Sequence, residues 1–384
     1  MSYRVAVLGA TGLVGRRFLE ILDQRVFPFG ELLALASERS AGTTVRCGDA
    51  LLPVRRAEPS AFEGVDLVLS SAGAAVSREL LPAAVQRGAV AVDNTSAFRM
   101  DPGVPLVVPE VNSHRIADHR GIIANPNCST IQLVVALKPL HDAFGVRRVV
   151  VSTYQSVSGA GQAAVEELHL GLGSTDRSAI IDRPLSSSSV AFNAVPHIDV
   201  FRDGGDTKEE WKMRVETPKI MEAPIELHAT CVRVPVVHSH SEAVWIETER
   251  PADPEAARAL LRDAEGVELL DDPQAARYPT CYDATGSDSV WVGRVRRDPT
   301  ATNALALWVV ADNLRKGAAL NAIQIAERLV EQWRSEGRPS RATASPVHFD
   351  GPRGRGSPQA AGRVPAPPRH RGGDHALELP GDDP

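Results

Sequence analysis

The chain has 384 residues, of which 43% are hydrophobic and 23% are charged, and its formal net charge is −6. This length and composition are typical of a soluble globular protein with two domains, and the charge gives no sign of a nucleic-acid or membrane partner. No apolar run approaches the ~20 residues that span a bilayer. The four cysteines are widely spaced without a CxxC pair, which argues against a zinc site or a disulfide framework and favours the cytoplasm.

The chain opens with a strand, a glycine-rich turn and a helix. Residues 3–9 (YRVAVLG) lead into GATGLVG at 9–15, and apolar residues then recur at helical spacing from Val14. Glycines let the backbone approach a pyrophosphate, and the helix N-terminus supplies N–H donors. The spacing is GxxGxxG rather than GxGxxG, and a plain tight turn would also need glycine. Its position between strand and helix nevertheless favours a dinucleotide site.

The second predicted strand, at 32–36, ends in SERSAG at 37–42. At this point an acidic residue binds the ribose of NAD, whereas an arginine binds the 2′-phosphate of NADP. Glu38 and Arg39 are adjacent, so this rule alone does not decide between NAD and NADP. The serines Ser37 and Ser40 flank the pair and favour a phosphate site, and therefore NADP. The alternative is a solvated loop with a mixed charge pair.

Short apolar strands continue to alternate with helices up to residue 124. The further strands are predicted at 66–73, 89–93, 106–108 and 121–124, with a helix around 80–85. This alternation predicts a parallel sheet covered on both faces. Ligands bind at the carboxyl ends of such strands, so we expect the residues that follow the strands to converge on one edge.

A cysteine stands at one of these strand ends, in ANPNCSTIQ at 124–132. Ser129 and Thr130 are residue types that begin helices, and the free N–H groups and the dipole of a helix start favour thiolate. Taken alone, Cys128 would more often be a buried structural cysteine. Arg99, predicted at the same edge, has the fork geometry that binds phosphate or carboxylate, although alone it would be an ordinary surface arginine.

After Pro139, which we expect to kink or restart the helix, the pattern becomes α+β. Strands are predicted at 148–154, 267–270, 289–294 and 304–310, long antiparallel strands at 226–236 and 243–249, helices at 207–221 and 254–264, a loop at 171–190 and a final helix from about 312. Residues 335–384 are rich in Pro, Gly and Arg without lysine, and we predict a disordered tail. The fold class is α/β, with an N-terminal Rossmann-type domain and an α+β domain containing a mixed sheet.

Several stretches together resemble the aspartate-semialdehyde dehydrogenase family. They are GATGLVG (9–15), ASERSAG (36–42), NTSAFRMDPGVPLVVPEVN (94–112), GIIANPNCSTIQ (121–132), TYQSVSGAG (153–161), ETPKI (216–220), CVRVPVVHSHSE (231–242) and DNLRKGAALNAIQIAE (312–327). The resemblance runs from residue 3 to about 333. It implies an NADP-binding domain at 1–127 with 313–334, a catalytic and dimerisation domain at 128–312, and a homodimer or homotetramer.

The resemblance also implies roles for the matching residues. Cys128 would be the nucleophile that forms a thioacyl intermediate, His240 the acid/base, and Gln155 the residue that orients the carbonyl. Arg99 and Lys219 would bind the phosphate, Arg233 the substrate carboxylate and Glu216 its amino end. The cofactor-binding set comprises Gly9, Thr11, Gly12, Leu13, Val14, Gly15, Ser37, Arg39, Ser40, Ser158, Gly159 and Asn313.

The reaction that this resemblance implies is the NADPH-dependent reduction of L-aspartyl 4-phosphate to L-aspartate 4-semialdehyde and phosphate. It belongs to the biosynthesis of lysine, diaminopimelate, methionine and threonine. Two cations offset an acyl phosphate without a metal, and a histidine takes and returns a proton at neutral pH. Two alternatives stay open: a related acyl-phosphate reductase such as N-acetyl-glutamyl-phosphate reductase, and a non-catalytic NADP-binding protein.

Overall fold

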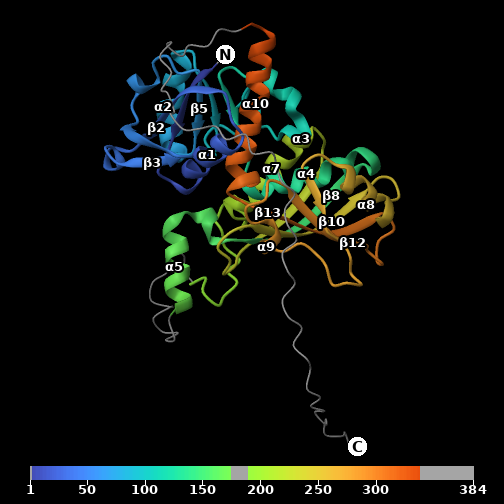
Figure 1. The fold of residues 1–384 in the computed structure, drawn as a ribbon. Helices are drawn as coiled ribbons and strands as arrows, with labels where there is room; N and C mark the ends of the chain where they lie inside the picture. The colour runs from blue at the N-terminus through green and yellow to red at the C-terminus, as the bar shows by residue number, and fades with distance from the viewer. Residues whose placement is uncertain (1, 174–188, 338–384) are drawn as a thin grey trace, which may run out of the picture. The chain divides into compact units, whose positions relative to one another are not determined.

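The computed structural model describes residues 2–173 and 189–337, which build two β-sheets (Figure 1). The first sheet has the strand order β3-β4-β2-β1-β5-β6-β7. Its strands are β1 (Tyr3–Leu8), β2 (Phe29–Ala36), β3 (Thr44–Cys47), β4 (Ala50–Arg56), β5 (Leu67–Ser70), β6 (Val90–Asp93) and β7 (Ile122–Ala124). All neighbours are parallel except β3 and β4, which form an antiparallel hairpin at the edge. The predicted parallel sheet is therefore confirmed, and the edge hairpin is an addition.

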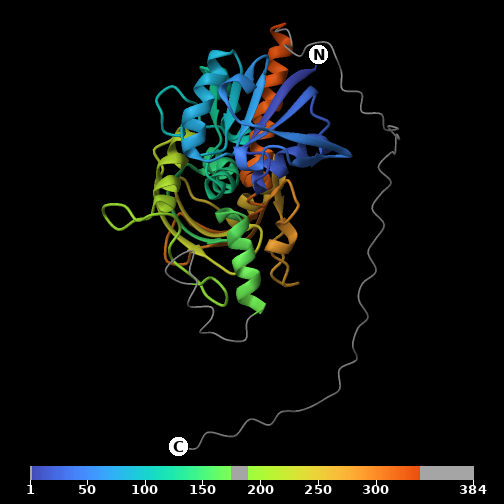
Figure 2. The same ribbon diagram turned by 90° about the vertical axis from the view of Figure 1, so that its left-hand side faces the viewer.

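Helices cover both faces of the first sheet. On one face, α1 (Leu13–Gln24) and α10 (Leu320–Ser335) bury their apolar sides, and on the other lies α2 (Ala74–Gln86). Figures 1 and 2 both show α10, at the end of the described chain, lying along this sheet. The ring centroids of Tyr3 and Trp333 are 5.4 Å apart, which joins the two ends of the described chain in one core.

The predicted strand at 106–108 is wrong. The segment makes only an isolated bridge between Leu106 and Ala124, and it leads into a short helix, α3 (Pro109–Asn112). Pro105 and Pro109 bracket the segment, and a proline has no N–H to donate to a strand ladder. The apolar residues of this segment are buried all the same, which explains why their pattern resembles that of a strand.

The second sheet is mixed, with the strand order β11-β12-β13-β10-β8-β9. Its strands are β8 (Val146–Gln155), β9 (Glu226–Arg233), β10 (His240–Thr248), β11 (Val267–Leu269), β12 (Val290–Arg297) and β13 (Ala304–Ala311). The predicted antiparallel strands at 226–236 and 243–249 correspond to β9 and β10, which run in opposite directions. They are not neighbours, because β8 lies between them and is parallel to β9. The chain passes from β8 to β9 through helix α7 (Lys208–Met221), and such a crossover makes strands parallel.

One face of the second sheet is covered by α4 (Cys128–Phe144), α7 and α8 (Pro254–Asp263), which share a single apolar core with it. Pro139 was expected to kink or restart the helix, and the restart is wrong, since α4 continues through Pro139. Proline removes one N–H bond from a helix, and the almost complete burial of α4 from Ser129 to Leu137 supplies the packing that outweighs this loss.

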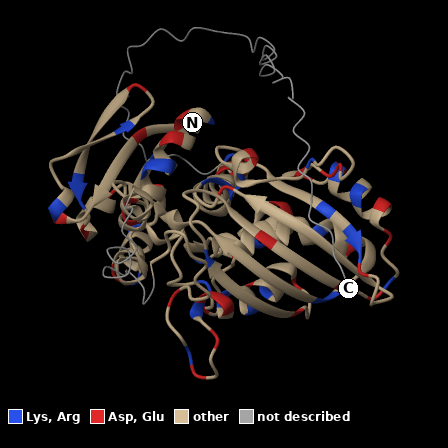
Figure 3. Cartoon of the chain, turned by 90° about the horizontal axis from the view of Figure 1, so that it is seen from below, with Lys and Arg blue, Asp and Glu red and all other residues tan. Residues whose placement is uncertain are grey.

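Basic and acidic residues are interspersed over the helices and strands of the described chain (Figure 3). More unusual are nine side chains of acidic or basic residues that lie inside it: Asp66, Asp93, Arg99, Glu209, Glu216, Glu242, Asp312, Arg315 and Lys316. Charged groups are rarely buried unless they are paired or functional. Among the described residues, no helix is long and apolar enough to cross a membrane. The predicted tail and most of the predicted loop at 171–190 lie outside the described residues.

Candidate active site

The glycine turn between β1 and α1 has the geometry of a phosphate cradle. Gly9 has a φ of +88°, a conformation that L side chains rarely adopt. A Cβ on Gly15 would lie 2.0 Å from the carbonyl oxygen of Gly9, so α1 approaches the turn this closely only because Gly15 has no side chain. Gly12 is the N-cap of α1 and makes no side-chain cap bond. The first N–H groups of α1 are thus left for an anion.

The candidate ribose-phosphate residues lie after β2, on a short 3₁₀ turn, η1 (Glu38–Ser40). Glu38 forms an exposed ion pair with Arg56 on β4, with 3.5 Å between Nη1 and Oε2. Arg39 is exposed and forms no ion pair with any described residue. The acidic residue of this turn is therefore engaged by β4, and the arginine remains open to a ligand.

Cys128 is the first residue of α4, as the sequence predicted, but its thiol lacks the expected stabilisation. The side chain of Asn127 caps α4 and accepts hydrogen bonds from the backbone N–H groups of Ser129 and Thr130. These are the donors that were expected to face the thiol. Burial, and then the carboxylate of Glu209, raise the pKa of the thiol to about 12. The cations Lys212, Arg99 and Arg233 lower the pKa of the thiol and so act in the opposite direction.

The ends of three adjacent strands bring further candidate residues to the same place. The parallel register of β8 and β9 pairs Gln155 with Arg233, and His240 begins β10 on the other side of β8. All three side chains are on the face that α4 covers, because alternate residues of a strand share a face. Arg233 donates from Nη1 to the carbonyl oxygen of Ser156, 2.6 Å away.

His240 is fully buried, and its ring orientation is fixed by hydrogen bonds. Its Nδ1 accepts a hydrogen bond from the backbone N–H of Ser156, at 3.0 Å. A neutral ring that accepts at Nδ1 carries its proton on Nε2, and Nε2 has no hydrogen-bond partner among the described residues. Burial, and then the charge of Arg233, lower the pKa of His240 to about 3, so the imidazole is neutral at physiological pH.

Asn313 and two serines hold the loop beside His240. The side-chain oxygen of Asn313 accepts from the hydroxyls of Ser156 and Ser158 and from the backbone N–H of Ser239. A Cβ on Gly159 would lie 3.3 Å from His240 Nε2 and from Arg233 Nη1. This glycine therefore leaves open the space into which His240 directs its free N–H.

Arg99 is buried at the same edge and is oriented by Glu216. Its Nη1 donates to Glu216 Oε1 at 3.0 Å, and its Nε donates to the carbonyl oxygen of Asn125 at 2.9 Å. The other oxygen of Glu216 accepts from the backbone N–H of Asn127, at 2.7 Å. Glu216 thus ties Arg99 to the loop that carries Cys128, and it does not line the cavity described below.

Lys219 also lies away from that cavity. Glu209 and Lys212, which the sequence reasoning missed, line it instead. Lys219 donates from Nζ to the carbonyl oxygens of Arg99 and Val104, at 2.5 and 3.2 Å. Two turns earlier on α7, Lys212 Nζ lies 2.9 Å from both Glu209 and Asp199. Burial lowers the pKa of Lys212, but the two carboxylates outweigh burial and raise it; burial raises the pKa of Glu209, but Lys212 brings it to about 2.

A signal for these residues exists in the sequence. Thr207 and Glu210 form a reciprocal capping box at the start of α7. A Thr-x-x-Glu pattern predicts that the third-position carboxylate is used by the cap. Glu209 and Lys212 are then left as an i, i+3 charge pair on a neighbouring face.

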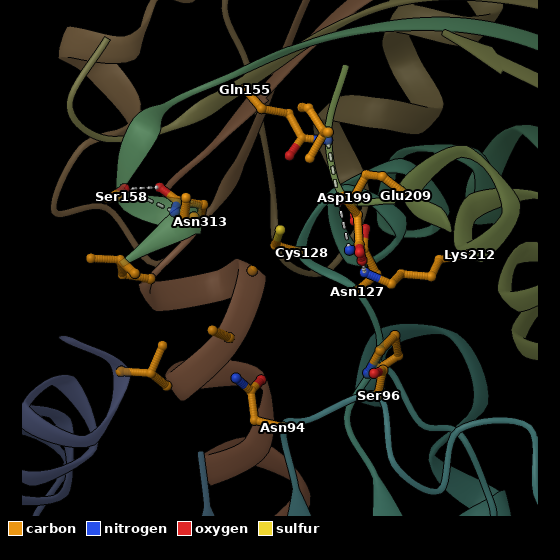
Figure 4. Close-up of a pocket in the computed structure, with 18 of the residues that line it drawn as sticks. Asn94, Ser96, Asn127, Cys128, Gln155, Ser158, Asp199, Glu209, Lys212 and Asn313 are labelled. Carbon is orange, nitrogen blue, oxygen red and sulfur yellow. Dashed lines mark hydrogen bonds and ion pairs between the residues drawn. The ribbon is translucent and has the colours of Figure 1, made fainter. Parts of the chain in front are cut away.

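A cavity of about 390 Å³ joins these parts. Eight predicted residues line it: Val14, Arg99, Cys128, Gln155, Ser158, Gly159, Arg233 and Asn313. Figure 4 shows the thiol of Cys128 between the Ser158–Asn313 pair and the group formed by Asp199, Glu209 and Lys212. The cavity therefore runs from the first turn of α1 to a cysteine surrounded by three cations and one carboxylate pair. His240 does not line the cavity, but it lies beside Gly159, which does. Within the described ranges, no cluster of three or more His, Cys, Asp or Glu side chains could hold a metal ion.

Comparison with known proteins supplies a family for this arrangement. Two family models match, described as "Semialdehyde dehydrogenase, NAD binding domain" over residues 4–119 and "Semialdehyde dehydrogenase, dimerisation domain" over residues 137–316. A relative from Aquifex aeolicus named aspartate-semialdehyde dehydrogenase is 51% identical over 337 residues, which cover 86% of this chain and 99% of the relative.

Two solved structures are informative for ligands. Aspartate semialdehyde dehydrogenase II from Vibrio cholerae, complexed with ASA, has a TM-score of 0.82 and 48% identity, and the match covers 87% of this chain and 99% of that one. Aspartate semialdehyde dehydrogenase from Candida albicans, with NADP, has a TM-score of 0.66 and 27% identity, covering 86% and 99%.

Proposed function

The chain belongs to the aspartate-semialdehyde dehydrogenase family, and from this premise we propose that it reduces L-aspartyl 4-phosphate to L-aspartate 4-semialdehyde and phosphate with NADPH. The observation that carries the proposal is the cavity in which Cys128 and charges of both signs lie at the carboxyl edge of a Rossmann-type sheet, with His240 beside its lining residue Gly159. In the reverse direction the same site oxidises the semialdehyde and takes up phosphate.

We assign the covalent step to Cys128 and the proton transfer to His240. The sulfur attacks the acyl carbon, the carbon–oxygen bond to phosphate breaks, and the thiol proton passes to the leaving phosphate, so that a thioester remains on Cys128. When bound, NADPH supplies the hydride that reduces this thioester. His240 carries a proton on the ring nitrogen that faces the space beside Gly159, so it donates this proton to the oxygen of the reduced thioester. It takes the proton back as the carbon–sulfur bond of the resulting hemithioacetal breaks, which releases the aldehyde and leaves a thiolate that regains its proton from solvent; oxidation runs the same steps in reverse.

Each charged group of the substrate is matched by a side chain of opposite charge in the cavity. Arg233 suits the α-carboxylate, because its guanidinium keeps donors besides the one that Ser156 accepts. Glu209 suits the ammonium group, and Arg99 with Lys212 suits the phosphate. Glu216 and Lys219 support this site through Arg99. Gln155, whose Nε2 lies 3.3 Å from Glu209 Oε1, orients the carbonyl beside them.

The cofactor residues fit NADP better than NAD. The uncapped first turn of α1 and the glycine turn receive the pyrophosphate, through Gly9 to Gly15. Glu38 is engaged by Arg56, which leaves Arg39 with Ser37 and Ser40 for a 2′-phosphate. Ser158, Gly159 and Asn313 stand where the cavity reaches Cys128, which suits the nicotinamide end.

The half-exposed face of the second sheet suits a second copy of the chain. Opposite the face covered by α4, α7 and α8, this face carries Tyr154 and Trp308, whose ring centroids are 5.5 Å apart, together with Trp245. Such residues are enriched in interfaces. We place the catalytic and dimerisation domain at 128–312 and the cofactor domain at 1–127 with 313–334, and we expect a homodimer in the cytoplasm.

The experiment that tests the proposed function is phosphate-dependent NADP reduction with aspartate semialdehyde. We expect turnover to require phosphate and to be faster with NADP than with NAD. Turnover with N-acetyl-glutamate semialdehyde instead would identify the related reductase. Binding of NADP without turnover of either aldehyde would identify a non-catalytic protein.

A further inference from the structure

Glu242 is a buried acid that the proposed mechanism does not use. It lies on β10 two residues after His240, and its side chain is fully buried. The strand register places it between Thr153 of β8 and Val309 of β13. Because alternate residues of a strand share a face, Glu242 points to the side on which Val244 and Ile246 pack with α4. It therefore lies next to His240 on the buried face of β10, the face that α4 covers.

Gln132 meets Glu242 from α4. It lies four residues after Cys128 and so occupies the same helix face, one turn further on. The Gln132 side chain is fully buried and close enough to Glu242 to act on the pKa of its carboxyl. Neither oxygen of Glu242 and neither polar atom of the Gln132 amide has a hydrogen-bond partner among the described residues. Buried polar groups are rarely left without hydrogen bonds, and these two side chains can supply the missing bonds to each other.

The count of donors and acceptors decides the protonation state of Glu242. An ionised carboxylate only accepts, so it would bind Gln132 Nε2 but leave Gln132 Oε1 without a donor and facing a negative charge. A neutral carboxylic acid donates its O–H to Oε1 while its carbonyl accepts from Nε2. This closes a ring of two hydrogen bonds that satisfies all four atoms.

The surroundings of the pair favour the same state. Burial raises the pKa of Glu242 well above its ordinary value, the Gln132 amide offsets only part of this, and no cation among the described residues adds to the offset. The titratable group across the sheet is Cys231, which pairs with Thr153 in the strand register, and burial raises the pKa of its thiol as well. Gln132 and Cys231 therefore bring no positive charge that would stabilise an ionised carboxylate on Glu242.

We propose that Glu242 is a neutral carboxylic acid paired with Gln132, and that this pair is a positioning device that sets the spacing between Cys128 and His240. Gln132 lies one helical turn after Cys128 on α4, and Glu242 lies two residues after His240 on β10. The pair joins the helix that carries the nucleophile to the strand that carries the acid. The inference rests on the proposed function in taking Cys128 and His240 as the reacting groups.

The protonation state is tested by the pH dependence of unfolding in wild type and Glu242→Gln. A folded pKa raised above 4.5 gives stability that is complete below that pH and is lost as the pH rises toward the folded pKa. The amide of the variant has no such loss. We expect the unfolding equilibrium constant of the wild type, relative to that of the variant, to rise about tenfold per pH unit above 4.5. A ratio that stays constant with pH would overturn the neutral acid.

The positioning role is tested by kinetics of Glu242→Gln and Glu242→Met. The Gln variant keeps a ring of two hydrogen bonds, whereas the Met variant leaves Gln132 without a partner. We expect the Met variant to lower kcat about 10- to 100-fold at nearly unchanged KM for aspartate semialdehyde and phosphate, and the Gln variant to restore most of kcat. Equal losses in both variants, or a loss confined to KM, would overturn the role.

These tests distinguish a failure of the Glu242–Gln132 proposal from a failure of the proposed function. If Glu242→Met does not fold, the pH series with Glu242→Gln and the recovery of kcat in that variant still decide the proposal. A wild-type protein without phosphate-dependent turnover would remove the proposed function and leave the pH series intact. Gln132→Met is the matched variant on the other element and is expected to lower kcat as Glu242→Met does.

Discussion

Two lysines on one helix give the sharpest test of how the cavity binds phosphate. Lys212→Met removes the cation that lines the cavity, and Lys219→Met removes one that binds backbone carbonyls outside it. A lost hydrogen bond to a charged group costs about 1.5–3 kcal/mol, which raises the KM for phosphate roughly 10- to 150-fold in Lys212→Met. Lys219→Met leaves two partly buried acceptors without their donor, so it is expected to lower the free energy of unfolding by about 1–3 kcal/mol and to change that KM only a few-fold.

The assay is steady-state NADP reduction with aspartate semialdehyde saturating and phosphate varied, alongside thermal unfolding of both variants. Lys212→Met also leaves Glu209 buried without its ion pair, so its stability is expected to fall as well. For this reason the comparison rests on KM values of folded enzyme. A KM for phosphate that rises in Lys219→Met and stays at the wild-type value in Lys212→Met would refute the placement of the phosphate.

Three further predictions follow from the same geometry. Arg233→Lys replaces a planar fork by a single ammonium and should raise the KM for aspartate semialdehyde about 10- to 100-fold at similar cofactor affinity; an unchanged KM would remove Arg233 from the substrate site. Gly159→Ala places a Cβ 3.3 Å from His240 Nε2 and should reduce kcat at least tenfold, whereas Gly173→Ala, which meets no atom within 4 Å, should match the wild type. The pKa of His240 is lowered from 6.5 to about 3, so the wild type should lose about 1.4 kcal/mol per pH unit relative to His240→Gln as the pH falls below 6.5; parallel stability curves for the two proteins would contradict a neutral buried imidazole.

Much of the fold follows from patterns that are local in the sequence. Alternating apolar strands and helices predicted the parallel sheet, and the glycine turn lies where expected between β1 and α1. The partners of the strands in the second sheet were less accessible, because pairing depends on the crossover through α7 rather than on the strands themselves. The continuation of α4 through Pro139 depends likewise on burial, which local propensity does not contain.

The candidate site shows the same division. The motif around Cys128 predicted its place at a helix start, but the pKa of the thiol depends on burial, and then on Glu209 and three cations that come from other elements. Lys212 and Lys219 are seven residues apart and share one side of α7, so the periodicity of the helix does not say which of them reaches the cavity. Lys212 is the lysine that reaches the cavity, because it is near the capped start of α7 and this end of the helix lies beside Cys128.

The central claim, that Cys128 carries the acyl group, is tested most directly by a rapid-mixing measurement without phosphate. Enzyme is mixed with NADP and aspartate semialdehyde, and NADPH is followed by absorbance. We predict a burst of one NADPH per active site, because the thioester forms but has no phosphate to release it, and renewed turnover when phosphate is added. The Cys128→Ala variant should bind NADP and give no burst. A burst of equal size in that variant would contradict the account.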